Sequence, residues 1–316
     1  MAPYDIMCKQ IEHQLEFGTQ KNHALSPMNQ LLLTLRFYAT GTFQLVVGDT
    51  LSVHKSTVCR TLHRVTSAIA GLRADYIKFP MSQEDRQRVM SEFHRVSGLP
   101  GVIGAVDCTH VAIQSPGGDD AEIYRNRKGN FSVNVQLVCD PTGYISDVVA
   151  RWPGSVHDST IFDNCHLRAL LETGPLNGYL VGDGGYPCRR YLLTPVNNPV
   201  NQAETAYNNA QIAARNCIER VNGMLKRRFP ALKYGMRIRL DRVLPVIVAT
   251  AVLHNIATVL GDEVPPVGDE LHHFFATKRL IALPGDDSDD EAGATIQPAA
   301  GGAAGMRHAV INGHFA

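Results

Sequence analysis

The sequence has no uninterrupted apolar run of the roughly 18 residues that a membrane-spanning helix needs. Its first residues also lack the basic segment followed by an apolar one that marks a secretory signal peptide. We therefore expect a protein that neither crosses a membrane nor enters the secretory pathway. Hydrophobic residues make up 44% of the chain and charged residues 19%, as in ordinary globular proteins.

No Cys-x-x-Cys pair occurs among the seven cysteines, which are scattered along the chain. The absence of such pairs argues against a zinc knuckle, and the odd number argues against a framework of disulfides. Reduced thiols in the cytosol or the nucleus are the expected state.

The chain also has no net charge, but its acidic and basic residues are unevenly distributed along the sequence. The segment 285–316 holds five acids and one arginine, so the rest of the chain has four more basic than acidic residues. Between Ala214 and Arg242 nine bases stand against two acids. Such a basic stretch suits a polyanion such as DNA, although a solvated helix face followed by a basic loop would have the same composition.

The first 75 residues read as helices. Ser26 and Pro27 form a typical helix start, and Gly41 interrupts the apolar pattern that follows. A short helix is expected over residues 42–47, and a longer one begins near His54. This short helix, turn and longer helix resemble a helix-turn-helix unit, in which Lys55 and Arg60 would face the DNA groove. The alternative is a set of packed helices that braces the core or binds a partner.

The remaining chain alternates between strand and helix patterns. Strands are expected over 102–113, 131–140, 144–152 and 179–182, and helices over 80–98, 157–171, 203–229 and 244–260. This order predicts an α/β domain with a mixed sheet flanked by helices. We expect a helical, helix-turn-helix-like region over 1–98, a catalytic α/β domain over 99–270 and a disordered acidic, Gly- and Ala-rich tail over 285–316.

Three carboxylates stand out in this plan. Asp107 interrupts an apolar strand, Asp183 follows a strand end and precedes two glycines, and Glu219 lies on the long helix. A charge in a buried strand is costly unless it is paired or binds a metal. Carboxylate oxygens are the ligands that Mg²⁺ prefers, and two such ions can promote cleavage of a phosphodiester. Arg215 and Lys226 share a helix face with Glu219 and would hold phosphates, although Arg215 would also suit a salt bridge with Glu219.

Five ordered motifs then give a family resemblance. They cover Gly104–His110, Tyr124–Gly129, Trp152–Asp158, Gly182–Tyr186 and Ile218–Phe229. The chain resembles the PIF/Harbinger transposases and the nucleases derived from them, over residues 25–265. The resemblance implies an RNase H-like catalytic domain whose catalytic triad is Asp107, Asp183 and Glu219.

The resemblance also implies a cofactor and a partner. Mg²⁺ or Mn²⁺ would be held by the triad and by Asp158, the acid of a further motif. Lys55, Arg60, Arg215, Lys226, Arg227 and Arg228 are the candidate DNA contacts. A Myb/SANT-like protein would supply much of the DNA recognition, so the isolated chain is expected to bind DNA weakly and with a steep salt dependence. The nucleus is the expected compartment, with the cytoplasm as a second one.

One position departs from the family pattern: Gln211 stands where a histidine is usual. The change either costs some activity or shifts one hydrogen bond. His157 is a candidate metal ligand or general base, and His110 a candidate neighbour of Asp107, but each suits a structural role equally well.

The sequence therefore predicts a metal-dependent DNA endonuclease of the Harbinger transposase-derived type. A catalytically idle transposase relative that binds DNA or protein is the alternative. A phosphoesterase for small substrates fits poorly with the basic segment. The target sequence and the oligomeric state do not follow from the sequence.

Overall fold

The computed structural model describes residues 3–18, 24–174, 177–263 and 303–316. They form an α/β protein with a mixed five-stranded sheet, helices that flank it and further helices at the N-terminus, which confirms the predicted fold class. Two compact units are interleaved along the chain. The first combines Met1–Ile77, His110–Val133 and Gly223–Gly285, and the second combines Lys78–Thr109, Asn134–Asn222 and Asp286–Ala316. The expected domain boundaries stay a prediction.

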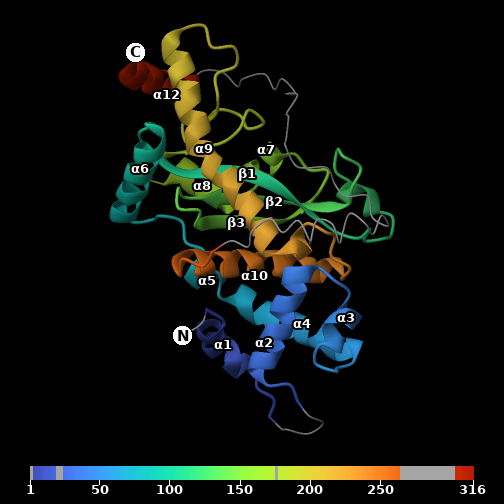
Figure 1. The fold of residues 1–316 in the computed structure, drawn as a ribbon. Helices are drawn as coiled ribbons and strands as arrows, with labels where there is room; N and C mark the ends of the chain where they lie inside the picture. Colours follow the sequence, from blue (N-terminus) through green and yellow to red (C-terminus); the bar gives the residue numbers. More distant parts are fainter. Residues whose placement is uncertain (1–2, 19–23, 175–176, 264–302) are drawn as a thin grey trace. The chain divides into compact units, whose positions relative to one another are not determined.

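The first unit is mainly helical (Figure 1). Its main helices are α1 (Pro3–Leu15), α2 (Pro27–Thr40), α3 (Gln44–Asp49), α4 (Lys55–Gly71), α5 (Arg73–Tyr76) and α10 (Leu240–Val259). Two short 3₁₀ turns, η1 (Ala121–Tyr124) and η2 (Pro230–Leu232), also belong to it. Helix α4 packs against α2, α3 and α10, so it lies at the centre of this unit.

Local sequence explains where these helices begin and end. The Ser26 hydroxyl accepts a hydrogen bond from the amide of Asn29, which caps α2 as predicted. Gly41 ends the helix with a φ of 60°, in the left-handed region that glycine adopts without strain. The ring of His54 accepts from the amide of Ser56 and caps α4. Helices α3 and α4 thus lie where the helix-turn-helix pattern predicts them.

Helix α10 is the core helix of the first unit. Among the described helices it is the one that is long and apolar enough, by length and composition, to cross a membrane. However, 61% of its apolar window is buried inside the protein. The helix agrees in position with the one predicted over 244–260.

The sheet has the strand order β3-β2-β1-β4-β5. Its strands are β1 (Val102–Ala112), β2 (Ser132–Cys139), β3 (Ile145–Pro153), β4 (Tyr179–Val181) and β5 (Leu192–Leu193). Strand β4 pairs in parallel with both β1 and β5. Asp140 closes the turn between β2 and β3, because its carboxylate accepts from the amides of Thr142 and Tyr144. The short strand β5 was absent from the sequence prediction, since two residues carry no periodic signal.

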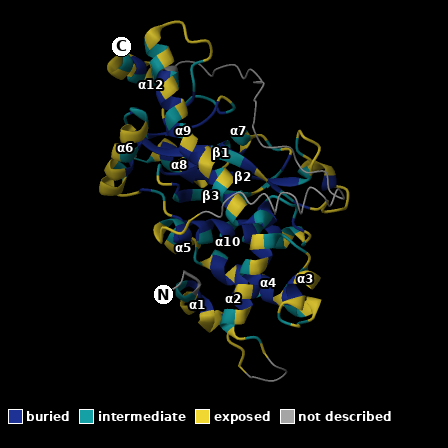
Figure 2. Ribbon diagram, in the orientation of Figure 1, coloured by how far each residue is buried: buried dark blue, intermediate teal, exposed yellow. Residues whose placement is uncertain are grey.

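Every residue of β2 is buried, including the polar Asn134 and Gln136 (Figure 2). The alternation of polar and apolar residues therefore does not mark a solvated face here. Polar side chains buried in a central strand need partners or a function, and Asn134 has one in the site described below.

Helices of the second unit flank the sheet. They are α6 (Gln83–Ser97), α7 (Asp158–Asp163), α8 (His166–Thr173) and α9 (Gln202–Arg228), whose last turn extends into the first unit. One helix was expected over 157–171, but the chain forms two. Cys165 separates them in an extended conformation and accepts the amide of Arg168 on its sulfur, which starts α8.

The last part of the segment that was expected to be a disordered tail is helical. Residues 285–302 lie outside the described residues, whereas α12 (Ala303–Val310) and a π-helical turn (Ile311–Phe315) are ordered. Ile311 is buried, and Arg307 donates to the carbonyl of Pro195. The Phe315 ring packs edge-on against Tyr207. A few anchoring side chains thus hold a segment whose Gly- and Ala-rich composition suggested disorder.

Candidate active site

Parallel pairing of β1 and β4 brings the first two predicted carboxylates together. Ala105 is aligned with Val181, and Asp107 and Asp183 each follow this pair by two residues. Side chains two residues apart on a strand point to the same face of the sheet. The register therefore places both acids on one face, at the point where β4 ends.

Asp107 is partly buried on β1 and is held by helix α9. The Asn222 side chain donates from Nδ2 to Oδ2 of Asp107 at 2.9 Å. The neighbouring Cys108 contacts the hydroxyl of Tyr186, with Sγ 3.3 Å from the oxygen. The strand and the segment after Asp183 are thus joined directly beside the acid.

Asp183 is 5% exposed, so its carboxylate is almost fully buried. The amide of Gly185 donates to its Oδ1 at 3.1 Å. A Cβ atom on residue 185 would lie 3.3 Å from that oxygen, which is tighter than most contacts of this kind, so glycine lets the backbone approach the acid closely. Gln211, fully buried on α9, donates to the carbonyl of Gly182 at 2.6 Å and fixes the end of β4. The departure from the family pattern therefore supplies a hydrogen bond at this position.

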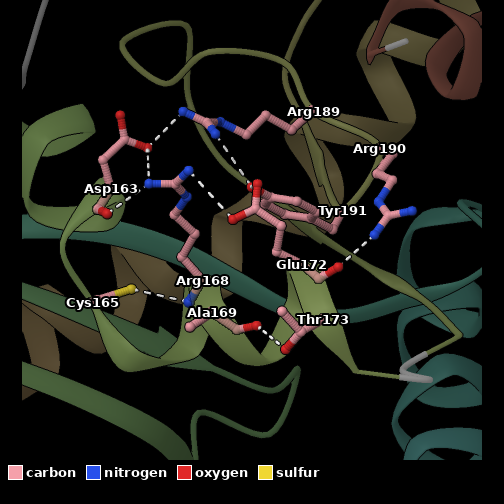
Figure 3. Close-up of polar contacts among 9 residues, drawn as sticks. All are labelled: Asp163, Cys165, Arg168, Ala169, Glu172, Thr173, Arg189, Arg190 and Tyr191. Carbon is pink, nitrogen blue, oxygen red and sulfur yellow. Dashed lines mark hydrogen bonds and ion pairs between the residues drawn. The ribbon is translucent and has the colours of Figure 1, made fainter.

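A polar network anchors the segment that leads away from Asp183 (Figure 3). Arg189 donates to Asp163 at the end of α7, with the two atoms 2.6 Å apart. Arg168 on α8 lies 3.3 Å from Glu172 and 3.8 Å from Asp163. Arg190 donates to the backbone carbonyl of Glu172. These contacts tie α7, α8 and the segment around residue 189 together.

Asp158 is the first residue of α7 and accepts a hydrogen bond from Asn134 of β2, at 2.8 Å. The same amide group of Asn134 donates to the carbonyl of Val156. The buried polar residue of β2 therefore holds the start of α7 and its acid. His157 precedes it at the N-cap position and is exposed.

Glu219 lies on α9 and forms a salt bridge with Arg215. Its carboxylate is 2.5 Å from Nη2 of Arg215, one helical turn earlier. The Glu219 side chain is 50% exposed, and that of Arg215 is 23% exposed. The salt bridge that the sequence offered as an alternative role for this glutamate is thus present.

The charges of the site act on one another. Desolvation by burial and the charge of Asp183 hold the pKa of Asp107 well above its usual range, with a smaller contribution from Asp158 and opposition from Arg215. Burial lowers the pKa of Arg215, but its hydrogen bond to Glu219 and the charges of Glu219, Asp107 and Asp183 outweigh this effect and raise it. Asp107, Asp158 and Asp183 therefore form one electrostatic cluster, and Arg215 links Glu219 to it.

Within the described part of the chain, no three His, Cys, Asp or Glu side chains are grouped so that they could hold a metal ion directly. The acids instead hold protein partners: Asn222 for Asp107, Gly185 for Asp183, Asn134 for Asp158 and Arg215 for Glu219. A cation at this site would have to replace or share some of these contacts. The metal-binding roles of the four acids stay a prediction.

The predicted DNA contacts differ in their surroundings. Lys55 and Arg60 are exposed on α4, and Arg227 is exposed on α9. Arg228 donates to the backbone carbonyl of Asp262 at 2.8 Å and lies beside His254, so it stabilises the first unit. The DNA-binding roles of all six basic residues, Arg215 and Lys226 included, stay predictions.

Sequence reasoning missed Asn222 and Asn134. Asn222 follows Glu219 by three residues and so shares its helix face, a spacing that could have revealed it. Asn134 is one of three polar residues that alternate with apolar ones in β2, so the sequence pattern did not single it out. His110, a proposed neighbour of Asp107, contacts the Ser132 hydroxyl at 3.0 Å.

Comparisons with known proteins show the family of the chain. A family model described as DDE superfamily endonuclease matches residues 106–255, which include all four acids. The chain is 36% identical to the mouse protein "Putative nuclease HARBI1" over 269 residues, which cover 80% of this chain and 77% of the relative. The human protein of that name is 36% identical over 78% of this chain and 71% of its own length. "Protein ALP1-like" of Arabidopsis thaliana is 27% identical over 82% of this chain and 69% of its own length. No solved structure matches the chain.

Proposed function

Because the chain belongs to the DDE superfamily endonucleases, we propose that it cleaves DNA phosphodiesters with divalent metal ions held at Asp107, Asp158, Asp183 and Glu219. The observation that carries the proposal is that Asp107 and Asp183 each follow the aligned pair Ala105 and Val181 by two residues, and that the charge of Asp183 acts on Asp107. Two like charges side by side in a partly buried site disfavour each other, and a divalent cation would relieve that repulsion.

The donor atoms suit Mg²⁺ or Mn²⁺. Carboxylate oxygens are hard ligands, and such ions keep several waters of their own, so few protein ligands are needed. The side chain of Asn222 donates to one oxygen of Asp107, so the other carboxylate oxygen would be left for a cation. These features fit a cation site better than a purely structural cluster of acids.

Ions bound there would supply an activated water and charge neutralisation at the leaving oxygen. The residues of the chain would do the positioning. Asp107 lies on a central strand, and Gly185 and Gln211 fix Asp183 and the end of β4. Glu219 would have to exchange Arg215 for the cation, which would free the Arg215 guanidinium for a DNA phosphate.

The proposal includes nuclear DNA as the substrate and a Myb/SANT-like protein as the partner that recognises it. Two features of the first unit support the need for a partner protein in DNA recognition. The exposed bases on its presumed recognition helix are few, with Lys55 and Arg60 as the main ones. Phe43, Leu45 and Val46 are 57%, 60% and 47% exposed around the start of α3 and offer an apolar surface for a protein.

A catalytically idle domain is the second candidate, and one observation favours it. Glu219 is already neutralised by Arg215, and the described residues contain no grouped metal ligands. If the acids hold the fold together through Asn222, Gly185, Asn134 and Arg215 alone, the domain would bind DNA or protein without cleaving. The two candidates differ in whether the site takes up a cation.

Anomalous diffraction from crystals soaked in Mn²⁺ tests this difference. We expect an anomalous peak at the Asp107 and Asp183 carboxylates in the wild type and its loss in the Asp183→Asn variant. The exposed Asp119 provides a control, since Asp119→Asn should leave the peak in place. Absence of any peak at these acids at millimolar Mn²⁺ would contradict the proposed function and favour the idle domain.

A further inference from the structure

Asn222 is the residue through which helix α9 reaches the central acid. It lies three residues after Glu219, so both side chains project from the same face of the helix. Its Nδ2 donates to Oδ2 of Asp107 at 2.9 Å, across 115 residues of sequence. Glu219, the residue that family resemblance assigns to the site, is instead bonded to Arg215.

The rest of the Asn222 amide is buried. Its Oδ1 is inaccessible to solvent and has no hydrogen-bond partner among the described residues. A buried polar atom without a partner is costly and calls for an explanation. A leucine of similar volume would fill the same space without this cost, so packing alone does not account for an asparagine here.

The amide suits one task in particular. A carboxylate that binds a metal through one oxygen is commonly fixed by a hydrogen bond to its other oxygen. The NH₂ group of Asn222 makes such a bond to Oδ2 and leaves further lone pairs of the carboxylate for a cation. Because α9 also carries Gln211, which holds the end of β4, the same helix would orient both strands of the acid pair.

We propose that Asn222 is a positioning residue of the acid cluster, which orients Asp107 toward a bound divalent cation. The inference rests on the proposed function, since it concerns the same site. It adds a residue that neither the triad nor the motif resemblance assigns, and it gives α9 a role at Asp107 that does not depend on Glu219.

Binding of Mn²⁺ alone, measured by the electron paramagnetic resonance signal of the free ion, tests this role without any need for activity. We expect Asn222→Leu and Asn222→Ala to weaken Mn²⁺ binding by about 10-fold or more, the effect typical for residues that orient metal ligands. Asn216 is an exposed asparagine on the same helix, and Asn216→Leu should bind as the wild type does. The metal-free variants should unfold within a few degrees of the wild type.

The outcomes separate the two proposals. Wild-type affinity in both Asn222 variants would overturn the positioning role and leave the proposed function intact. Weak binding that comes with a large drop in the unfolding temperature of both variants would also overturn it, because Asn222 would then be structural. A wild-type protein that binds no Mn²⁺ would overturn both proposals.

Discussion

At the scale of single residues, the negative charge of Asp107 is in an unfavourable environment. The acid lies in a strand whose earlier residues are fully buried, next to Asp183 and Asp158. Only Arg215 opposes this among the charges that act most strongly on it. The repulsion among these carboxylates destabilises the folded protein, and a bound cation would remove that repulsion.

A pH-dependent stability follows from this arrangement. The folded-state pKa of Asp107 lies well above its unfolded value, which is about 3.9. A carboxyl group with a raised folded pKa stabilises the fold when protonated, and this stability is lost as the pH rises from the unfolded toward the folded pKa. In EDTA at neutral pH we expect Asp107→Asn to raise the unfolding temperature, by at least roughly 2–4 °C.

Differential scanning calorimetry across pH 4–8 would measure this gain. The advantage of the variant should shrink toward pH 4, and added Mn²⁺ should stabilise the wild type but not the variant. A variant less stable than the wild type at neutral pH without metal would show that the acid supports the fold rather than straining it.

Residue identities could be predicted where a charge interrupts an apolar pattern. Asp107 was found in this way because its neighbours are strongly apolar, and Asp183 was found because it follows a strand and precedes two glycines. The pairing of Glu219 with Arg215 was visible as a spacing but could not be decided, since helical spacing is the same for a salt bridge and for a metal ligand. Asn222 was missed because its partner is 115 residues away, and only the fold brings them together.

At the scale of elements, local signals predicted most boundaries. Ser26, Gly41 and His54 cap helices where the sequence indicated, because capping depends on neighbours in the chain. Elements that depend on contacts between distant parts of the chain were harder to predict from the sequence. Strand β5 is two residues long and exists through its pairing with β4, and the split between α7 and α8 depends on Cys165.

The C-terminal helix gives a prediction at this scale. Ile311 is 3% exposed where α12 ends, and Arg307 and Phe315 make the neighbouring contacts of the tail. A buried aspartate would pay a large desolvation cost, so Ile311→Asp should release the tail and destabilise the second unit by about 1–3 kcal/mol. Met306, 41% exposed on the same helix, provides the control.

Hydrogen exchange and limited proteolysis would detect the release. Residues 303–316 should lose amide protection and become cleavable in Ile311→Asp but not in Met306→Asp. Equal protection in both variants would mean that the tail is not held through Ile311.

At the scale of the whole molecule, the similarity to known proteins covers 80% of the chain. The chain is similar to proteins named "Putative nuclease HARBI1", and also to a plant protein whose name carries no such activity. Family membership therefore establishes the domain, while cleavage depends on whether the four acids accept a cation in place of their present partners. The sequence alone could predict the acids and the possible partner of Glu219 on its own helix, but not Asn222 or Asn134, because these reach the acids only in the folded chain.

Nicking of supercoiled plasmid by the purified full-length chain tests the central claim most directly. We expect Mg²⁺ or Mn²⁺ to support nicking, Ca²⁺ and EDTA to prevent it, and Asp107→Asn to reduce it more than about 100-fold, since even the outer partners of metal ligands cost 10–100-fold. Asp119→Asn should cleave as the wild type does. Nicking that persists in EDTA or in Asp107→Asn, or no nicking by a wild type that binds Mn²⁺, would contradict the account.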